Sequence, residues 1–109
     1  LAAEECPIHP AYKEAVIKAT DTQVSVMGRV GGVPCRVLKN RFCRDYIALE
    51  REGADKEALE EMLGGSLRQA VQEGDSSKGA FMMGLVAASI KEIKPLDQLL
   101  ADLFAGVEL

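Results

Sequence analysis

The sequence predicts a mostly helical fold with one short β patch or hairpin, an α+β arrangement. Its 109 residues, 48% hydrophobic and 28% charged, have the size and balance of one globular domain. Apolar residues recur at helical spacing in several segments that Gly or Pro residues separate. Val24–Met27 instead alternates as a half-buried strand does. Because aromatic residues make up 5% of the chain and Trp is absent, we expect an aliphatic core.

The first half of the chain is predicted to hold two helices around the β patch. Pro10 suits the first position of a helix. The apolar face of that helix consists of Tyr12, Ala15, Val16 and Ala19. After the strand Val24–Met27 and a glycine-rich turn, residues 33–35 can return as a second strand, with Pro34 at an edge. A second helix is expected over residues 36–51. Its apolar stripe consists of Leu38, Phe42, Tyr46 and Leu49.

The second half is predicted to be helical throughout. Asp55 is a good N-cap for a third helix, which ends at Gly64 and Gly65. Ser66 is expected to cap a short helix that stops at Gly74. The third helix and this short one are expected to bury Leu59, Met62, Leu63, Leu67, Ala70 and Val71. Residues 80–88 are apolar on all sides, which predicts a helix buried on every face, against a missing domain or a second subunit. Pro95 opens a last amphipathic helix.

Charge and composition exclude several classes of protein. A net charge of −4 argues against sequence-independent nucleic-acid binding. The longest apolar run is about half of the roughly 20 residues that a membrane span needs, and no secretory signal is evident. Leu1 in place of Met suggests a processed product or a piece of something longer. The three cysteines lack a CxxC pair and His9 is the only histidine, so no metal site is expected. Reduced, buried or half-buried thiols and a cytoplasmic location are the simplest reading.

Candidate chemistry in the residues themselves is sparse. The turn with Gly28, Gly31 and Gly32 and the helix start at Gly64-Gly65-Ser66 both offer free N–H groups to a phosphate, but a tight turn and a plain helix cap explain them as well. Met82 and Met83 could line a ligand pocket or simply fill the core. The remaining candidates are a basic helix side and an N-terminal acid–base group. They consist of Arg36, Lys39, Arg41 and Arg44, and of Glu4, Glu5 and His9. We expect a solvated face and disordered or capping roles, and no catalytic residue emerges.

Four segments taken in order, however, resemble one family. They are residues 4–13 (EECPIHPAYK), Cys35-Arg36-Val-Leu-Lys39-Asn40, Gly74-Asp75 with Gly79 and Met82-Met83-Gly84, and Ile93-Lys-Pro95 with the helix after it. The set is similar to the C-terminal part of the FMN-dependent nitronate monooxygenase (2-nitropropane dioxygenase) family. Type II flavin-containing enoyl-acyl-carrier-protein reductases are close relatives of that family. The resemblance covers nearly the whole chain.

The resemblance implies a segment of a larger flavoenzyme with an FMN-binding (β/α)₈ barrel. Residues 1–20 resemble the last barrel helix and residues 21–109 the small, helical capping domain. FMN would be bound mainly by the barrel, with Met82 and Gly84 of this chain approaching it. Leu85 departs from the family's Gln, so the polar group that the family places toward the cofactor pocket is absent at this position.

Several functions remain open at this stage. The resemblance implies an oxidoreductase that oxidises nitronates with oxygen, or alternatively reduces enoyl thioesters with NAD(P)H. The barrel is the expected partner, with no nucleic acid and no membrane. The segment alone is expected to be inactive and to form homo-oligomers through exposed apolar faces or the Val24–Met27 patch. A non-enzymatic helical interaction module is the remaining alternative.

Overall fold

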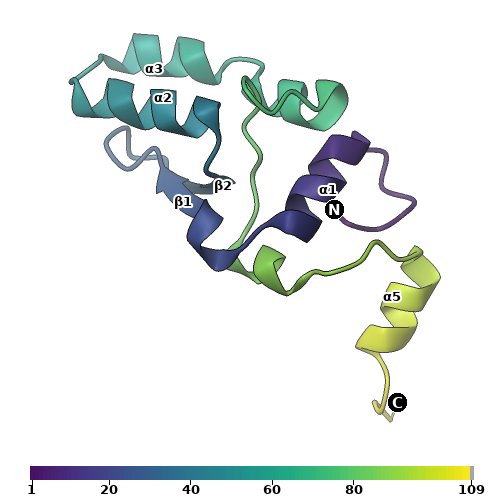
Figure 1. The fold of residues 1–109 in the computed structure, drawn as a ribbon. Coiled ribbons are helices and arrows are strands. Elements are labelled where there is room, and N and C mark those ends of the chain that lie inside the picture. The colour runs from purple at the N-terminus through teal and green to yellow at the C-terminus, as the bar shows by residue number, and fades with distance from the viewer. Residues whose placement is uncertain (109) are drawn as a thin grey trace.

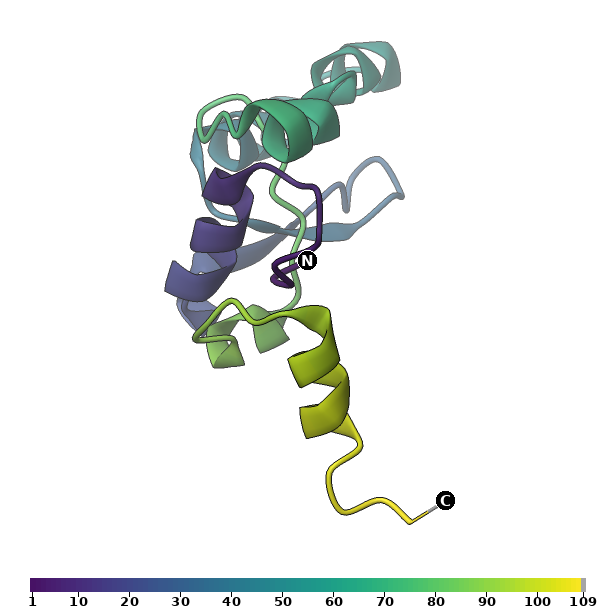
Figure 2. The same cartoon turned by 90° about the vertical axis from the view of Figure 1, so that its right-hand side faces the viewer.

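A two-stranded antiparallel sheet and the extended chain beside it connect two groups of helices (Figure 1). The computed structural model describes residues 1–108. The elements are α1 (Pro10–Lys18), η1 (Asp21–Gln23), β1 (Val24–Met27), β2 (Cys35–Leu38), α2 (Arg41–Arg51), α3 (Lys56–Leu63), α4 (Ser66–Arg68), η2 (Gln69–Glu73), η3 (Leu85–Ser89) and α5 (Leu96–Leu103). The molecule measures 52 × 26 × 23 Å, and α5 projects from one end of it (Figure 2). The mostly helical fold with one hairpin is therefore confirmed.

Helix α1 forms where its first residues predict it. Pro10 takes the first turn, and the Nδ1 atom of His9 accepts a hydrogen bond from the Ala11 N–H at 3.0 Å. Tyr12, Val16 and Ala19 are buried, as the helical spacing indicates. Helix α1 thus packs its apolar face into the core, and His9 caps its N-terminus.

The hairpin turn encloses a carboxylate. Gly28 lies at φ +84°, and a Cβ there would lie 2.3 Å from the Val33 carbonyl oxygen, so the turn needs glycine at this position. The two oxygens of Glu50, a buried residue on α2, accept hydrogen bonds from the N–H groups of Gly28 at 2.9 Å and Val30 at 3.0 Å. The turn does bind an anion, as its free N–H groups suggest, but that anion is the protein's own side chain.

The second strand and the second helix divide the chain differently from the prediction. Residues 33–35 do not form the strand by themselves. Strand β2 spans Cys35–Leu38, pairing Val24 with Leu38 and Met27 with Cys35. Helix α2 begins only at Arg41, because Asn40 caps it: Asn40 Oδ1 accepts from the Cys43 N–H at 3.0 Å. The predicted helix is present, but its predicted start at residue 36 was wrong. The four basic residues from 36 to 44 therefore do not share one helix side. Pairing with β1 takes Arg36 and Leu38 into the sheet.

Residues 80–88 do not form the predicted buried helix. Residues 80–84 are extended and run beside β2, after which η3 makes one short 3-10 helix. Leu38 N–H donates to the Phe81 carbonyl at 2.9 Å, and Met83 N–H donates to the Arg36 carbonyl at 3.2 Å. Burial consequently alternates, because Phe81 is 2% and Met83 7% exposed while Met82 between them is 38% exposed. Backbone partners on β2, which lie far away in the sequence, outweigh the helical preference of this run.

The short helix after α3 also starts differently. Gly65, in the left-handed region at φ +75°, occupies the N-cap position, and Ser66 is the first helical residue. The Ser66 hydroxyl donates to the Leu63 carbonyl at 2.7 Å, which ties the new helix to the end of α3. Ser66 is therefore no cap, whereas Asp55, whose Oδ1 accepts from the Ala58 N–H, caps α3 as predicted.

Two core clusters meet at the extended segment. One gathers around Tyr12 and Phe81, whose ring centroids are 4.9 Å apart, and the other around Phe42 and Tyr46 at 6.2 Å. Most of the other core members are aliphatic, as expected, but aromatic pairs lie within both clusters. The total accessible surface is 7241 Å². A folded monomer of this mass exposes about 5,900 Å², so the chain leaves much surface uncovered. No helix among residues 1–108 is long and apolar enough to cross a membrane.

Replacing Glu50 by Ala should loosen the hairpin turn without unfolding the chain. Two charge-assisted hydrogen bonds disappear, which lowers the local opening free energy by about 1.5–3 kcal/mol. Trypsin should then cleave after the exposed Arg29 roughly ten to a hundred times faster. The matched control is Glu52→Ala, which removes an exposed carboxylate just after the same helix. Equal cleavage rates in the two variants would contradict this role of Glu50.

Candidate functional site

The exposed residues Met82, Gly84, Leu85 and Val86, here named the surface strip, form the candidate site. Met82 is 38%, Leu85 50% and Val86 71% exposed, and Gly84 is also at the surface. Both predicted cofactor-binding residues, Met82 and Gly84, lie in this strip. They share one side of the extended chain because residues two apart project the same way, while Phe81 and Met83 are buried on the other. The structure thus brings the two predicted residues together.

The fold itself does not require glycine at position 84. Its φ of −88° and ψ of 175° suit any residue, and a Cβ there would meet nothing within 4 Å. By contrast, a Cβ on Gly79 would lie 2.8 Å from the Ala70 backbone. A glycine that neither backbone conformation nor packing requires, in an exposed and extended backbone, allows a flat group to approach the main chain closely.

A cavity of about 440 Å³ adjoins the strip. Its walls include Ala3, Val16, Met83, Gly84, Ala87 and Leu99, so they come from the N-terminus, α1, the strip, η3 and α5. The lining is apolar apart from Glu92, whose carboxylate lies 3.2 Å from the Lys94 amino group. The volume falls within the range of small-molecule sites. The lining suits an apolar ring or an apolar side chain from another domain.

These residues fit part of a flavin only. The strip offers an open backbone and apolar side chains, which suit the edge or face of the isoalloxazine ring. The charged group in the cavity lining is a carboxylate, which repels phosphate. Of the two predicted residues, Gly84 lines this cavity and Met82 lies outside its lining. The lining offers no cation for a phosphate group.

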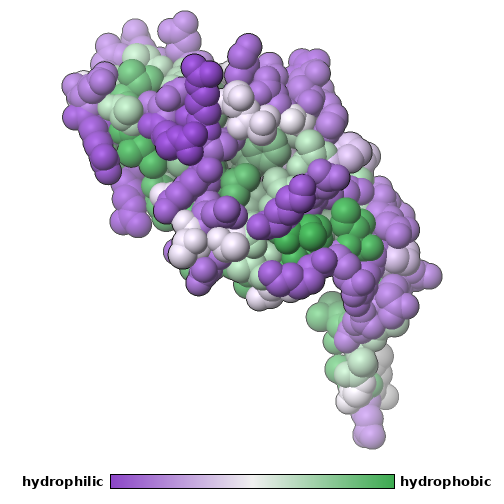
Figure 3. Space-filling model, in the orientation of Figure 1, coloured by the Kyte–Doolittle hydropathy of each residue, from purple (hydrophilic) through white to green (hydrophobic). Residues whose placement is uncertain are grey.

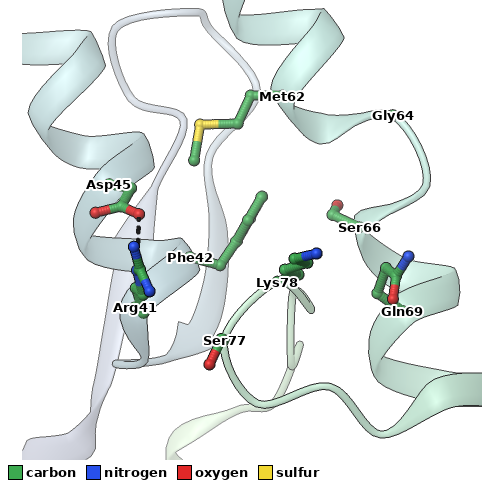
Figure 4. Close-up of a pocket in the computed structure, with 9 residues that line it drawn as sticks. All are labelled: Arg41, Phe42, Asp45, Met62, Gly64, Ser66, Gln69, Ser77 and Lys78. Carbon is green, nitrogen blue, oxygen red and sulfur yellow. Dashed lines mark ion pairs between the residues drawn. The ribbon is translucent and has the colours of Figure 1, made fainter.

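A second cleft, of about 410 Å³, lies between α2, the end of α3 and the turn at residues 77–78 (Figure 4). Phe42 lies in the middle of it, with Arg41 and Asp45 on one side and Lys78 on the other. The Arg41 Nε and Asp45 Oδ2 atoms are 3.7 Å apart at the surface, which contributes little energy. No nucleophile is paired with a base here, so the cleft offers no catalytic geometry.

The N-terminal acidic and histidine side chains do not converge into an acid–base group. His9 caps α1, while Glu5 accepts the Leu96 N–H of α5 at 2.6 Å. The Glu4 carbonyl accepts a hydrogen bond from the Lys13 amino group at 3.0 Å. The capping roles expected as the alternative are confirmed for His9 and Glu5.

The three thiols are free, and none is placed for catalysis. Cys43 is buried, and Cys6 and Cys35 are half-buried. Burial raises the pKa of the Cys43 thiol, and burial together with the nearby Glu50 raises that of Cys35, so the reactive thiolate is disfavoured at both. Over residues 1–108 no group of three or more potential metal ligands comes together.

One contact of the strip was missed by sequence reasoning. The hydroxyl of Tyr12 donates a hydrogen bond to the Met82 carbonyl across 70 residues of sequence. The periodicity of α1 placed Tyr12 in the core, but no local signal reveals which backbone group its hydroxyl meets.

Apolar surface extends beyond the strip onto α5. Figure 3 shows apolar atoms along this projecting helix, which buries none of its residues. Leu103 is 70% and Phe104 54% exposed. Exposed apolar residues on α5 and in the strip therefore lie at the same end of the molecule, and apolar patches of this kind are typical of interaction surfaces.

The chain is similar to known proteins in sequence and in structure. The family model described as nitronate monooxygenase matches residues 1–106. The structure of FabK from Thermotoga maritima superposes with a TM-score of 0.89 and 43% sequence identity, covering 95% of this chain and 33% of that chain. A methionine-to-alanine mutant of the same FabK gives a TM-score of 0.75 and 39% identity, covering 95% of this chain and 30% of that chain. The chain thus spans about one third of the length of these relatives.

Alanine substitutions at Gly84 and Gly79 should differ sharply in their effect on folding. Gly79→Ala forces a Cβ into backbone atoms at 2.7–2.8 Å and should lower the free energy of unfolding by about 1–3 kcal/mol. Gly84→Ala meets open space and should change it by about 0.5 kcal/mol or less, or raise it slightly. Urea denaturation of both variants measures the difference. A comparable loss at Gly84 would show that the fold itself needs this glycine.

Proposed function

The chain belongs to the nitronate monooxygenase family, and we propose that it is the C-terminal segment of an FMN-dependent oxidoreductase. The observation that carries the proposal is the family match over residues 1–106. The likeness over 95% of this chain to FabK, a type II enoyl-acyl-carrier-protein reductase, supports the same proposal. The interaction-module alternative has no such support.

In this function the chain contributes a wall of the flavin site and no catalytic residue. Bound FMN carries the electrons, as in other flavoenzymes. The surface strip, with Met82 and Gly84, covers part of the ring and keeps water away from it. Leu85, exposed beside them, makes this wall apolar. The segment without its barrel is then inactive, because the phosphate-binding and reacting groups lie outside it.

The barrel is the proposed partner of the uncovered apolar surface. Covering the strip and α5 removes Val86, Leu103 and Phe104 from water, which stabilises the assembly by about 25 cal/mol per Å² of apolar surface. In the division proposed for the chain, residues 1–20 belong to the last barrel helix and residues 21–109 to the capping domain. The packing of Tyr12 and Val16 against Phe81 supports a tight joint between the two parts.

The likeness to FabK favours reduction of an enoyl thioester with NAD(P)H as the reaction, because 43% identity extends over almost the whole segment. Oxidation of a nitronate with oxygen is the second candidate, favoured by the description of the matching family. The residues of the strip do not separate the two, because we expect the residues that discriminate between the substrates to lie on the barrel.

Anaerobic spectroscopy of the protein produced with its whole reading frame tests this function. We expect a yellow protein whose visible absorption bleaches on addition of NAD(P)H. Bleaching by a nitroalkane, with NAD(P)H without effect, would select nitronate oxidation instead. A well-folded protein that takes up no flavin would overturn the proposed function and favour the interaction module.

The 109-residue chain alone should self-associate through the surface that the barrel covers. Sedimentation velocity should show a concentration-dependent shift to dimers or larger species, which the double substitution Val86→Ser with Leu103→Ser weakens. The control is Val30→Ser with Val33→Ser, equally exposed positions on the hairpin. A monomer at high concentration, or an equal effect of the two double variants, would contradict the assigned surface.

A further inference from the structure

The surface strip begins at a backbone group held by a buried tyrosine. Tyr12 is 2% exposed, and its hydroxyl donates to the carbonyl of Met82. Its ring packs against Phe81 with centroids 4.9 Å apart and planes inclined by 35°. The contact joins α1 to the residue with which the strip starts, 70 positions later in the chain.

The geometry of the extended segment explains why this carbonyl needs a partner from α1. The Phe81 carbonyl and the Met83 N–H both bond to β2, at 2.9 and 3.2 Å. In an extended chain successive residues turn their backbone groups to opposite sides, so the Met82 carbonyl faces away from β2. Figures 1 and 2 show the segment passing between the hairpin and α1. The Tyr12 hydroxyl therefore gives the segment a hydrogen-bond partner on one side, as β2 does on the other.

Tyr12 remains a hydrogen-bond donor to Met82 at neutral pH. Burial raises its pKa to about 12, an effect that the hydrogen bond to Met82 partly opposes. The hydroxyl therefore keeps its proton at neutral pH. An ionised oxygen next to the Met82 carbonyl would repel it instead.

We propose that Tyr12 is a positioning residue, whose hydroxyl fixes the Met82 carbonyl and thereby sets the distance of Met82 and Gly84 from the bound cofactor. The inference rests on the proposed function, because it needs a flavin in front of the strip. Tyr12 itself is buried behind the strip and contacts neither cofactor nor substrate. A shift of the Met82 backbone would move the apolar wall of the site without changing any side chain in it.

Tyr12→Phe in the flavin-containing protein tests the role, because it removes one oxygen and keeps the ring on Phe81. We expect about fivefold weaker FMN binding, the size of one neutral hydrogen bond, together with a shifted flavin absorption spectrum. A second readout needs no flavin: amide exchange at Met83 and Leu38, the N–H groups that bond the segment to β2, should accelerate by a similar factor.

Two controls separate positioning from stability. Val24→Ala opens a cavity in the same core cluster but leaves the Tyr12–Met82 bond in place, so it should lower thermal stability and leave FMN affinity and spectrum unchanged. Tyr46→Phe removes a hydroxyl from the other cluster and should change neither the FMN affinity nor the flavin spectrum.

The outcomes distinguish this inference from the function on which it rests. An unchanged FMN affinity and spectrum in a yellow Tyr12→Phe protein overturns the positioning role and leaves the flavoenzyme standing. The same overturning follows if Val24→Ala weakens FMN as much as Tyr12→Phe does. A wild-type protein that binds no flavin overturns the proposed function, and the positioning role with it.

Discussion

The pairing of residues 80–84 with β2 is the interaction on which the rest of the structure depends. Two backbone hydrogen bonds, from Leu38 to Phe81 and from Met83 to Arg36, hold an otherwise helix-prone apolar run in an extended form. Phe81 then enters the cluster of α1, while Ala80 enters the cluster of α2 and α3. The same alternation turns Met82 outward. The pairing with β2 therefore both connects the two core clusters and exposes Met82 at the surface.

Several acidic side chains that could serve as catalytic groups instead accept backbone hydrogen bonds at turns and helix ends. Glu50 is held by two N–H groups of the hairpin turn. Asp75 accepts from the N–H groups of Ser77 and Lys78, which lowers its pKa. Glu5 caps α5. With these groups committed to structure, the surface strip offers shape and apolar contact, which agrees with the proposal that a bound cofactor supplies the reactivity.

Local signals predicted those elements whose stability is local. Pro10 and His9 define the start of α1, and Asp55 that of α3, because caps and first-turn residues act within three or four positions. The boundaries near Arg36 and the form of residues 80–88 depended on partners up to about fifty residues away, which periodicity does not contain. Met82 and Gly84 came from the family resemblance, while the Tyr12 hydroxyl bond needed the folded chain to be visible.

Extended structure at the strip is also better suited to a cofactor wall than the predicted helix would be. A helix satisfies its own backbone groups and presents side chains outward, so a flat ligand meets side-chain tips. An extended backbone with Gly84 at its surface allows a ring to reach the main chain itself. The position of that main chain is set from behind, by β2 and by Tyr12. The position of this backbone therefore depends on buried residues behind it, and in the proposed function those residues would set how closely the strip approaches the ligand.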